Sequence, residues 1–272
     1  MTTRRQTLEL LTGSVAIVGA ATAVGSASAP VPRRFAGQII TRARLPKSDK
    51  VVCLTFDDGP KPGATELVLK LLKLHGAKAT FFLIGKHVQA NPELVAQMVR
   101  DGHAVGNHSW SHAKSLTKAE AEREVTATAA AIERAGGVRP VVFRPPFGMR
   151  TSALAQAAQA QRLPLVLWSI SSADTQADVT ASTIANNILH TPYSGDVILM
   201  HDGGGDHSET VKALPTILAG LQQMGMQCIT VPELLTRWDA QCAEAAKAKP
   251  KMNGAAKRDA ARARMRAAAA PR

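Results

Sequence analysis

Residues 51–60 read VVCLTFDDGP, a strand-like run that ends in two adjacent carboxylates and a Gly-Pro turn. Because successive side chains of a strand point to opposite faces, Asp57 and Asp58 can take different partners where this strand ends. Two negative charges this close favour a cation nearby. Asp, Gly and Pro also dominate ordinary turns, so the alternative is that residues 57–60 only form a loop.

Two histidines lie in a second polar motif, NHSWSH at residues 107–112, which follows a short apolar stretch. His108 and His112 are four residues apart, a spacing that predicts one helical turn with both imidazoles on the same face. A carboxylate and two imidazoles leave open positions on a bound metal, which is typical of catalytic rather than structural zinc. The two motifs together favour a three-ligand metal site.

Four motifs in this order resemble the successive motifs of the polysaccharide deacetylase family, metal-dependent carbohydrate esterases that include chitooligosaccharide and peptidoglycan deacetylases. They comprise residues 55–60, 108–112, 144–148 and 199–202, and the resemblance spans roughly residues 51–237. It implies that Asp58, His108 and His112 hold the metal. It also implies that Asp57 is the general base that takes a proton from the attacking water.

Three further residues are predicted to carry the chemistry. Arg144 comes from a segment that two following prolines make rigid, and it is expected to keep Asp57 ionised and oriented. Matched to the family, His201 is the general acid that protonates the leaving amine. Asp174 is the candidate that supports His201, because a carboxylate helps a histidine to hold its proton near neutral pH.

Four residues are predicted to contact the substrate: Phe147, Gly148, Trp110 and Leu199. For the aromatic rings of Trp110 and Phe147, a packing role is an equally open alternative. The sequence departs from the family at Asp174, which the family usually follows with a Trp. Here Thr175 follows, and Trp168 lies six residues upstream. This departure bears on substrate preference more than on the chemistry.

Strand-like and helical segments alternate along the chain and predict parallel βαβ units. The strand-like segments are residues 51–56, 79–84, 103–106, 141–143, 164–168, 196–200 and 227–230. The helical segments are residues 64–74, 92–100, 118–134, 152–161, 182–189 and 209–224. The pattern alone fits a closed barrel or an open sheet. The resemblance implies an α/β fold, a distorted seven-stranded (β/α) barrel of the polysaccharide deacetylase type.

The chain divides by composition into a signal peptide (1–29), a surface lead-in (30–47), a catalytic domain (48–240) and a basic, disordered tail rich in Ala, Lys and Arg (241–272). An apolar run and small residues follow Arg4 and Arg5, which predicts export and cleavage after Ala29. The adjacent arginines suggest the twin-arginine route, but the route stays open. An uncleaved anchor is the alternative, which the Gly and Ala content disfavours. We therefore expect a periplasmic, extracellular or cell-envelope protein.

The formal net charge of +12 is concentrated near the C-terminus, where residues 243–272 carry nine Lys and Arg against Glu244 and Asp259. Such a tail predicts loose contact with an anionic cell envelope, or solubility alone. Nucleic acid is not expected, because no base-stacking aromatics interleave the charges. Three cysteines leave at least one free or paired between chains, and the oligomeric state stays open.

The resemblance implies a secreted, metal-dependent hydrolase that removes N-acetyl groups from N-acetylglucosamine-containing glycans, either chitooligosaccharide or peptidoglycan. Zinc suits the mixed nitrogen and oxygen ligands, with cobalt, nickel or manganese as alternatives. Two other functions stay open: an O-acetyl esterase acting on acetylated xylan, and a glycan-binding protein without catalysis.

Overall fold

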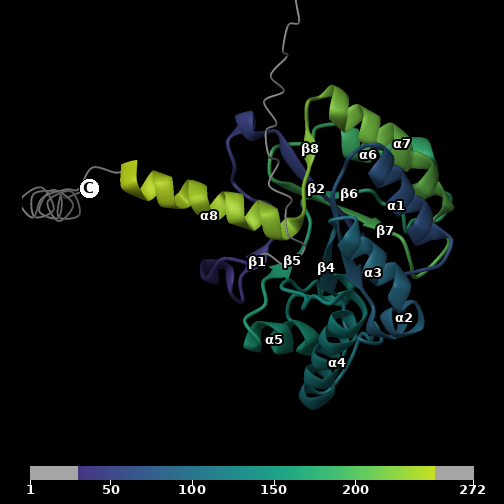
Figure 1. The fold of residues 1–272 in the computed structure, drawn as a ribbon, viewed down its shortest axis with the longest axis vertical. Helices are drawn as coiled ribbons and strands as arrows, with labels where there is room; N and C mark the ends of the chain where they lie inside the picture. The colour runs from purple at the N-terminus through teal and green to yellow at the C-terminus, as the bar shows by residue number, and fades with distance from the viewer. Residues whose placement is uncertain (1–29, 249–272) are drawn as a thin grey trace, which may run out of the picture.

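Strand β2, Val51–Asp57, lies at the centre of the fold, and all seven of its residues are buried. The structure is a computed structural model that describes residues 30–248. Strand β2 pairs in parallel with β3 on one side and β7 on the other, which explains its mostly apolar sequence. The larger sheet has the order β4, β3, β2, β7, β6, and β8 also pairs with β2 (Figure 1). These strands are β3 Ala79–Leu83, β4 Ala104–Asn107, β6 Ile170–Ser171, β7 Asp196–His201 and β8 Gln227–Cys228.

A second pair of strands, β1 Ile39–Ile40 and β5 Leu165–Val166, lies between the two ends of this sheet. Phe143 forms bridges to Asn107 in β4 and to Leu165 in β5, and the backbone N–H of Ser169 bonds to Val197 of β7. These links close the curved sheet on itself, which confirms the predicted distorted α/β barrel. The predicted strand at 141–143 is reduced to one bridging residue, Phe143, because the prolines around it have no N–H for a ladder.

Eight α-helices in the described range surround these strands (Figure 1). They are α1 Ala64–Leu74, α2 Gly85–Ala90, α3 Pro92–Arg100, α4 Lys118–Gly136, α5 Ala153–Ala160, α6 Ala181–Leu189, α7 Ser208–Gln223 and α8 Val231–Ala248. The six predicted helices are all present, and α4 begins with the reciprocal cap of Thr117 and Glu120. Two helices were not predicted: α2, whose six residues are too few to show a period, and α8, which includes residues 241–248 of the segment that was expected to be disordered.

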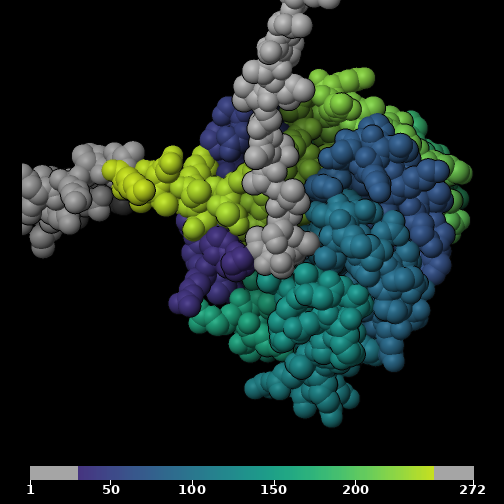
Figure 2. Space-filling view, in the orientation of Figure 1, coloured from purple at the N-terminus to yellow at the C-terminus, as the bar shows by residue number. Residues whose placement is uncertain are grey.

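Two predicted boundaries need correction. The segment 30–47 is not only a surface lead-in: Phe35, Ile40 and Ala43 are buried, and Ile40 belongs to β1. The Phe35 ring packs 5.0 Å from the ring of Trp238 in α8. The boundary predicted at 240 falls inside α8, whose outer end projects from the body of the protein (Figure 2).

Several sequence predictions lie on residues that the structure does not describe. The proposed signal peptide at 1–29 lies wholly outside the described residues, as does the tail from residue 249 onward. Within residues 30–248, no helix is both long enough and apolar enough to cross a membrane. The three cysteines form no disulfide in the described range, and Cys53 is buried in the core.

Candidate active site

A cavity of about 460 Å³ opens at the carboxyl ends of the central strands. Its lining brings together most of the residues predicted from the sequence, although they come from five separate segments of the chain. The lining residues are Asp57, Asp58, His108, His112, Pro145, Phe147, Gly148, Trp168, Ser171, Thr175, Leu199 and His201. Parallel α/β folds place their active sites at this end of the strands.

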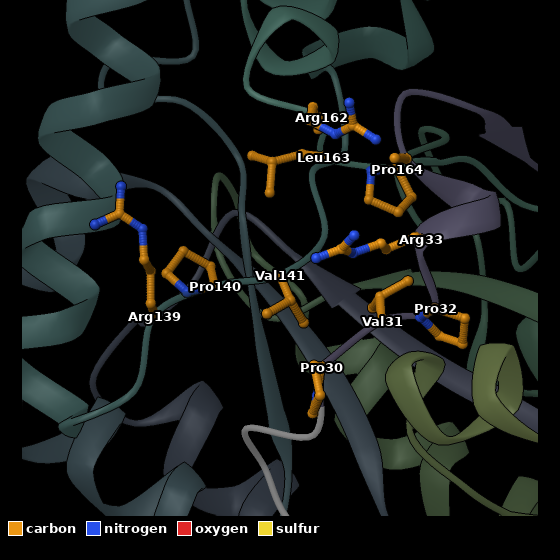
Figure 3. Close-up of a pocket in the computed structure, with 11 residues that line it drawn as sticks. Pro30, Val31, Pro32, Arg33, Arg139, Pro140, Val141, Arg162, Leu163 and Pro164 are labelled. Atoms are coloured by element: carbon orange, nitrogen blue, oxygen red, sulfur yellow. The ribbon is translucent and has the colours of Figure 1, made fainter.

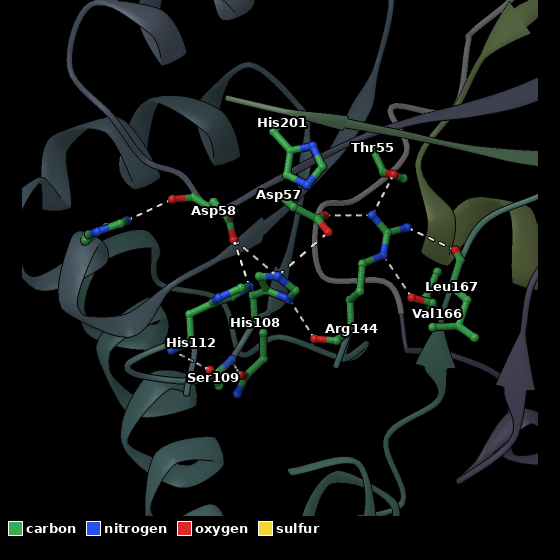
Figure 4. A network of polar contacts seen from close by, with 12 residues as sticks. Thr55, Asp57, Asp58, His108, Ser109, His112, Arg144, Val166, Leu167 and His201 are labelled. Atoms are coloured by element: carbon green, nitrogen blue, oxygen red, sulfur yellow. Dashed lines mark hydrogen bonds and ion pairs between the residues drawn. The ribbon is translucent and has the colours of Figure 1, made fainter. Parts of the chain in front are cut away.

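Asp58 and two histidines form the candidate metal site at the edge of this cavity (Figure 4). Oδ1 of Asp58 lies 3.4 Å from Nε2 of His108 and 3.4 Å from Nε2 of His112. This oxygen is buried and has no hydrogen-bond partner among residues 30–248. A buried oxygen facing two imidazole nitrogens is the donor set that a divalent ion prefers.

The protonation of the two imidazoles also fits metal binding. Nδ1 of His108 donates a hydrogen bond of 2.7 Å to the backbone carbonyl of Arg144, which leaves the Nε2 lone pair of His108 facing Asp58. Burial lowers the pKa of His112, which favours the neutral imidazole that metal binding needs. Burial alone would raise the pKa of Asp58, but the nearby His108 and His112 lower it to about 2. The three residues therefore fit a divalent metal.

The loop that carries the histidines is not the helical turn that their spacing predicted. Ser109 and His112 have φ angles of 66° and 60°, outside the right-handed helical region. The Asn107 side chain accepts the N–H of Ser109, and Glu124 of α4 accepts the N–H groups of Trp110 and Ser111. These side-chain contacts replace helical bonds, and they bring the two imidazole rings within 5.0 Å.

Arg144 is fully buried and reaches Asp57 from the side opposite to the metal site (Figure 4). Its Nη1 donates 2.7 Å to Oδ1 of Asp57 and 2.8 Å to the hydroxyl of Thr55. Its Nε and Nη2 donate to the carbonyls of Val166 and Leu167. The predicted pair is present, and its geometry is fixed by four hydrogen bonds.

His201 and Asp174 form the second predicted pair. Nδ1 of His201 donates 2.9 Å to Oδ1 of Asp174, while the His201 N–H and the Thr210 hydroxyl donate to Oδ2. Burial alone would lower the pKa of His201, but the Asp174 hydrogen bond and the charge of Asp57 raise it to about 9. His207, which was not predicted, stacks on the His201 ring at 5.5 Å.

The predicted substrate contacts are brought together only in part. Phe147, Gly148 and Leu199 line the cavity, and the Phe147 ring lies 4.4 Å from that of His112. Trp110 does not line it: a Cβ atom on Gly85 would lie 2.3 Å from the Trp110 indole, which packs against the main core. Packing of this indole against α2 therefore replaces the predicted sugar contact.

Trp168 supplies an aromatic wall that sequence reasoning did not assign to the site. It lines the cavity, and its Cη2 would lie 2.8 Å from a Cβ atom on Gly148, so only glycine fits beneath the ring. Its position two residues after β5, at a strand's carboxyl end, was a usable signal. The pocket therefore keeps an aromatic face although Thr175 occupies the position after Asp174.

A separate cavity of about 320 Å³ lies at the opposite end of the strands (Figure 3). It is lined by Pro30, Val31, Pro32, Arg33, Ala36, Arg139, Pro140, Val141, Arg162, Leu163 and Pro164. None of these described residues carries a carboxyl, imidazole, thiol or hydroxyl group. The cavity therefore offers no acid–base or metal chemistry.

Comparisons with known proteins agree with this geometry. Residues 44–166 match the family model described as Polysaccharide deacetylase. A peptidoglycan-N-acetylglucosamine deacetylase of Bacillus cereus is 39% identical over 194 residues, covering 70% of this chain and 91% of that protein. A chitooligosaccharide deacetylase of Azorhizobium caulinodans is 32% identical over 205 residues, covering 70% and 97%. A crystal structure of a peptidoglycan N-acetylglucosamine deacetylase superposes with a TM-score of 0.68 at 32% identity, covering 74% of this chain and 94% of that one.

Proposed function

Because this chain belongs to the polysaccharide deacetylase family, we propose that it is a metal-dependent hydrolase that removes N-acetyl groups from N-acetylglucosamine-containing glycans. One arrangement carries the proposal. Asp57, paired with Arg144, and His201, paired with Asp174, border the same cavity as the candidate metal site. A base, an acid and a metal site around one cavity are what amide hydrolysis requires.

Asp58, His108 and His112 would hold the metal, and zinc suits their mixed nitrogen and oxygen donors, with cobalt, nickel or manganese as alternatives. When bound, the ion would polarise the acetyl carbonyl and make the attacking water more acidic. The protein's part is to present three buried or half-buried donors, with the tautomer of His108 set by its hydrogen bond to the Arg144 carbonyl.

Asp57 is the proposed general base. Its Oδ2 lies 3.8 Å from Nε2 of His108, beside the metal site but outside the set of three donors. The guanidinium of Arg144 holds the other oxygen, so the carboxylate keeps one orientation. As the water oxygen attacks the acetyl carbon, Asp57 takes its proton.

His201 is the proposed general acid. Since its pKa is raised to about 9, the imidazole is protonated at neutral pH. As the C–N bond breaks, Nε2 gives its proton to the nitrogen, and the products are acetate and a free amine. An amide nitrogen leaves only after it is protonated, whereas an ester oxygen leaves more readily. A general acid such as His201, whose protonated form Asp174 stabilises, therefore favours N-deacetylation over the O-acetyl esterase alternative.

Two features support a glycan substrate over other amides. The relatives named above act on peptidoglycan N-acetylglucosamine and on chitooligosaccharide. Phe147 at the cavity mouth is 51% exposed, and its ring can stack on a sugar. The glycan-binding alternative does not explain the buried Asp57–Arg144 pair or the hydrogen-bonded His201–Asp174 pair at one cavity.

The location of the enzyme is also a proposal. The sequence features of residues 1–29 support export to the periplasm or cell envelope, where such glycans lie. Fractionation of cells that express the full chain tests this. Recovery of the protein, unshortened, from the cytoplasm would contradict it.

Acetate release tests the proposed activity. The protein is stripped with a chelator and then assayed, with and without added zinc, on N-acetylglucosamine oligomers, peptidoglycan and acetylated xylan. We expect release from one or both N-acetylated glycans only after zinc is restored. Release from acetylated xylan alone would favour the esterase. Glycan binding without any release would favour the non-catalytic alternative.

A further inference from the structure

A second cavity shares a wall with the active-site cavity. It has a volume of about 420 Å³ and is lined by Pro60, Lys61, Pro62, His87, Asn91, Gly204 and Gly205. Asp58 forms the wall: its carbonyl accepts 2.8 Å from Nδ1 of His87, and a Cβ atom on Gly204 would lie 2.5 Å from its Oδ2. Asp58 therefore lies between the candidate metal site and this second cavity.

The lining of the second cavity is rich in hydrogen-bond donors. Nζ of Lys61 donates 2.6 Å to the carbonyl of Gly205, and two of its N–H groups stay available. The amide of Asn91 donates one N–H to the carbonyl of His87 and keeps another. Among the described lining residues there is no carboxylate. The nearby Asp206 lies just beyond, and its Oδ1 accepts the N–H of Ser208.

The backbone around Lys61 is held in place before any substrate binds. Prolines on both sides restrict its torsion angles, and its N–H donates 2.8 Å to the hydroxyl of the buried Thr65. The ammonium group is therefore presented from a rigid segment, with the Gly205 carbonyl fixing its far end. Such preorganisation lowers the entropy cost of binding an anion.

We propose that this second cavity binds a carboxylate on the sugar next to the one that is deacetylated, with Lys61 as the specificity-determining residue. The inference rests on the proposed function and names its substrate class. Glycans with a carboxylate on alternate sugars, as in the lactyl ether of peptidoglycan strands, are preferred over neutral N-acetylglucosamine oligomers. A neutral oligomer offers the ammonium of Lys61 no carboxylate.

Three tetrasaccharides of equal length test this: a neutral N-acetylglucosamine tetramer, a peptide-free peptidoglycan tetrasaccharide, and its methyl ester. Each is assayed for binding and for acetate release with the zinc-loaded full chain and its Lys61→Gln and Lys61→Arg variants. Lys70→Gln is the matched control, because Lys70 is also exposed and lines neither cavity.

We expect Lys61→Gln to raise the KM and Kd for the acidic tetrasaccharide by about fivefold, the upper end for an exposed ion pair. Binding of the neutral tetramer and the ester is expected to be unchanged, as is kcat. Lys61→Arg is expected to retain the preference, which should weaken as salt is added. The unchanged protein is expected to bind the acid more tightly than its ester.

Two results would overturn the inference. One is equal affinity of the unchanged protein for the acid and its ester, and the other is an identical effect of Lys61→Gln and Lys70→Gln on the acid. If no tetrasaccharide releases acetate, the proposed function fails. The binding measurements then still decide the inference, because they need no turnover.

Discussion

Nη1 of Arg144 lies 2.7 Å from Oδ1 of Asp57, and the two side chains are 0% and 4% exposed. A buried pair of this kind costs about 3–5 kcal/mol when one partner is removed, because the other charge stays buried and unpaired. We expect Arg144→Gln to lower both kcat and the free energy of unfolding, the latter by about 3 kcal/mol. Chemical denaturation and acetate release measure the two effects. Arg123→Gln, at an exposed position of α4, is expected to change neither.

The pH dependence of activity is expected to follow His201. Because the Asp174 hydrogen bond helps raise the pKa of His201 to about 9, the acid is protonated at neutral pH and loses its proton as the pH rises through that value. Activity should therefore fall on the alkaline side. Asp174→Asn removes the charge that supports the imidazolium, so this fall should move to lower pH, with kcat at neutral pH reduced about 100-fold. An unchanged alkaline limb in a pH–rate profile of this variant would contradict the assigned acid.

Gly204 is expected to be essential for the shape of the metal site. It has a φ angle of 80°, and a Cβ atom there would lie 2.5 Å from Oδ2 of Asp58. Gly204→Ala should displace this carboxylate and weaken zinc binding about tenfold or more. At Gly205 the closest atom to an added Cβ, Nε2 of His207, is 3.5 Å away, so Gly205→Ala serves as the control. Equal zinc affinity of the two variants in a competition titration would show that a methyl group at position 204 does not displace the Asp58 carboxylate.

Glu124 is expected to hold the metal-binding loop in place from α4. Its Oε2 accepts the N–H groups of Trp110 and Ser111, each at 3.0 Å, just before His112. Glu124→Ala frees this loop and should weaken zinc binding about tenfold. Glu122→Ala removes an exposed carboxylate from the same helix and should have no effect. Calorimetric zinc titration of both variants measures this, and unchanged affinity in Glu124→Ala would show that the loop needs no such anchor.

The parts of the fold that depend on local signals were predictable from the sequence. Helices α1 and α3 have the predicted bounds, because their apolar periods and their ends are encoded by neighbouring residues. Strands β1 and β6 have two residues each, and only pairing with distant segments defines them. No local pattern of two residues can show such pairing.

The site was predictable in its residues but less so in its geometry. Motifs pointed to Asp57, Asp58 and the two histidines, and the structure brings these side chains together. The loop conformation at His112 depends on Glu124, which the sequence places in another element. Which tryptophan lines the cavity likewise depends on tertiary packing. Trp110 packs against Gly85, whereas Trp168 packs against Gly148. Local spacing carries no information on such contacts.

The central claim is a division of labour between neighbouring aspartates, Asp58 as metal ligand and Asp57 as base. The most direct test is to compare Asp57→Asn and Asp58→Asn, the same chemical change at adjacent positions, for zinc content and acetate release. We expect Asp57→Asn to bind as much zinc as the unchanged protein and to lose activity about 100-fold or more, whereas Asp58→Asn loses zinc and activity together. Equal zinc loss in both variants, or zinc loss in Asp57→Asn alone, would contradict this account.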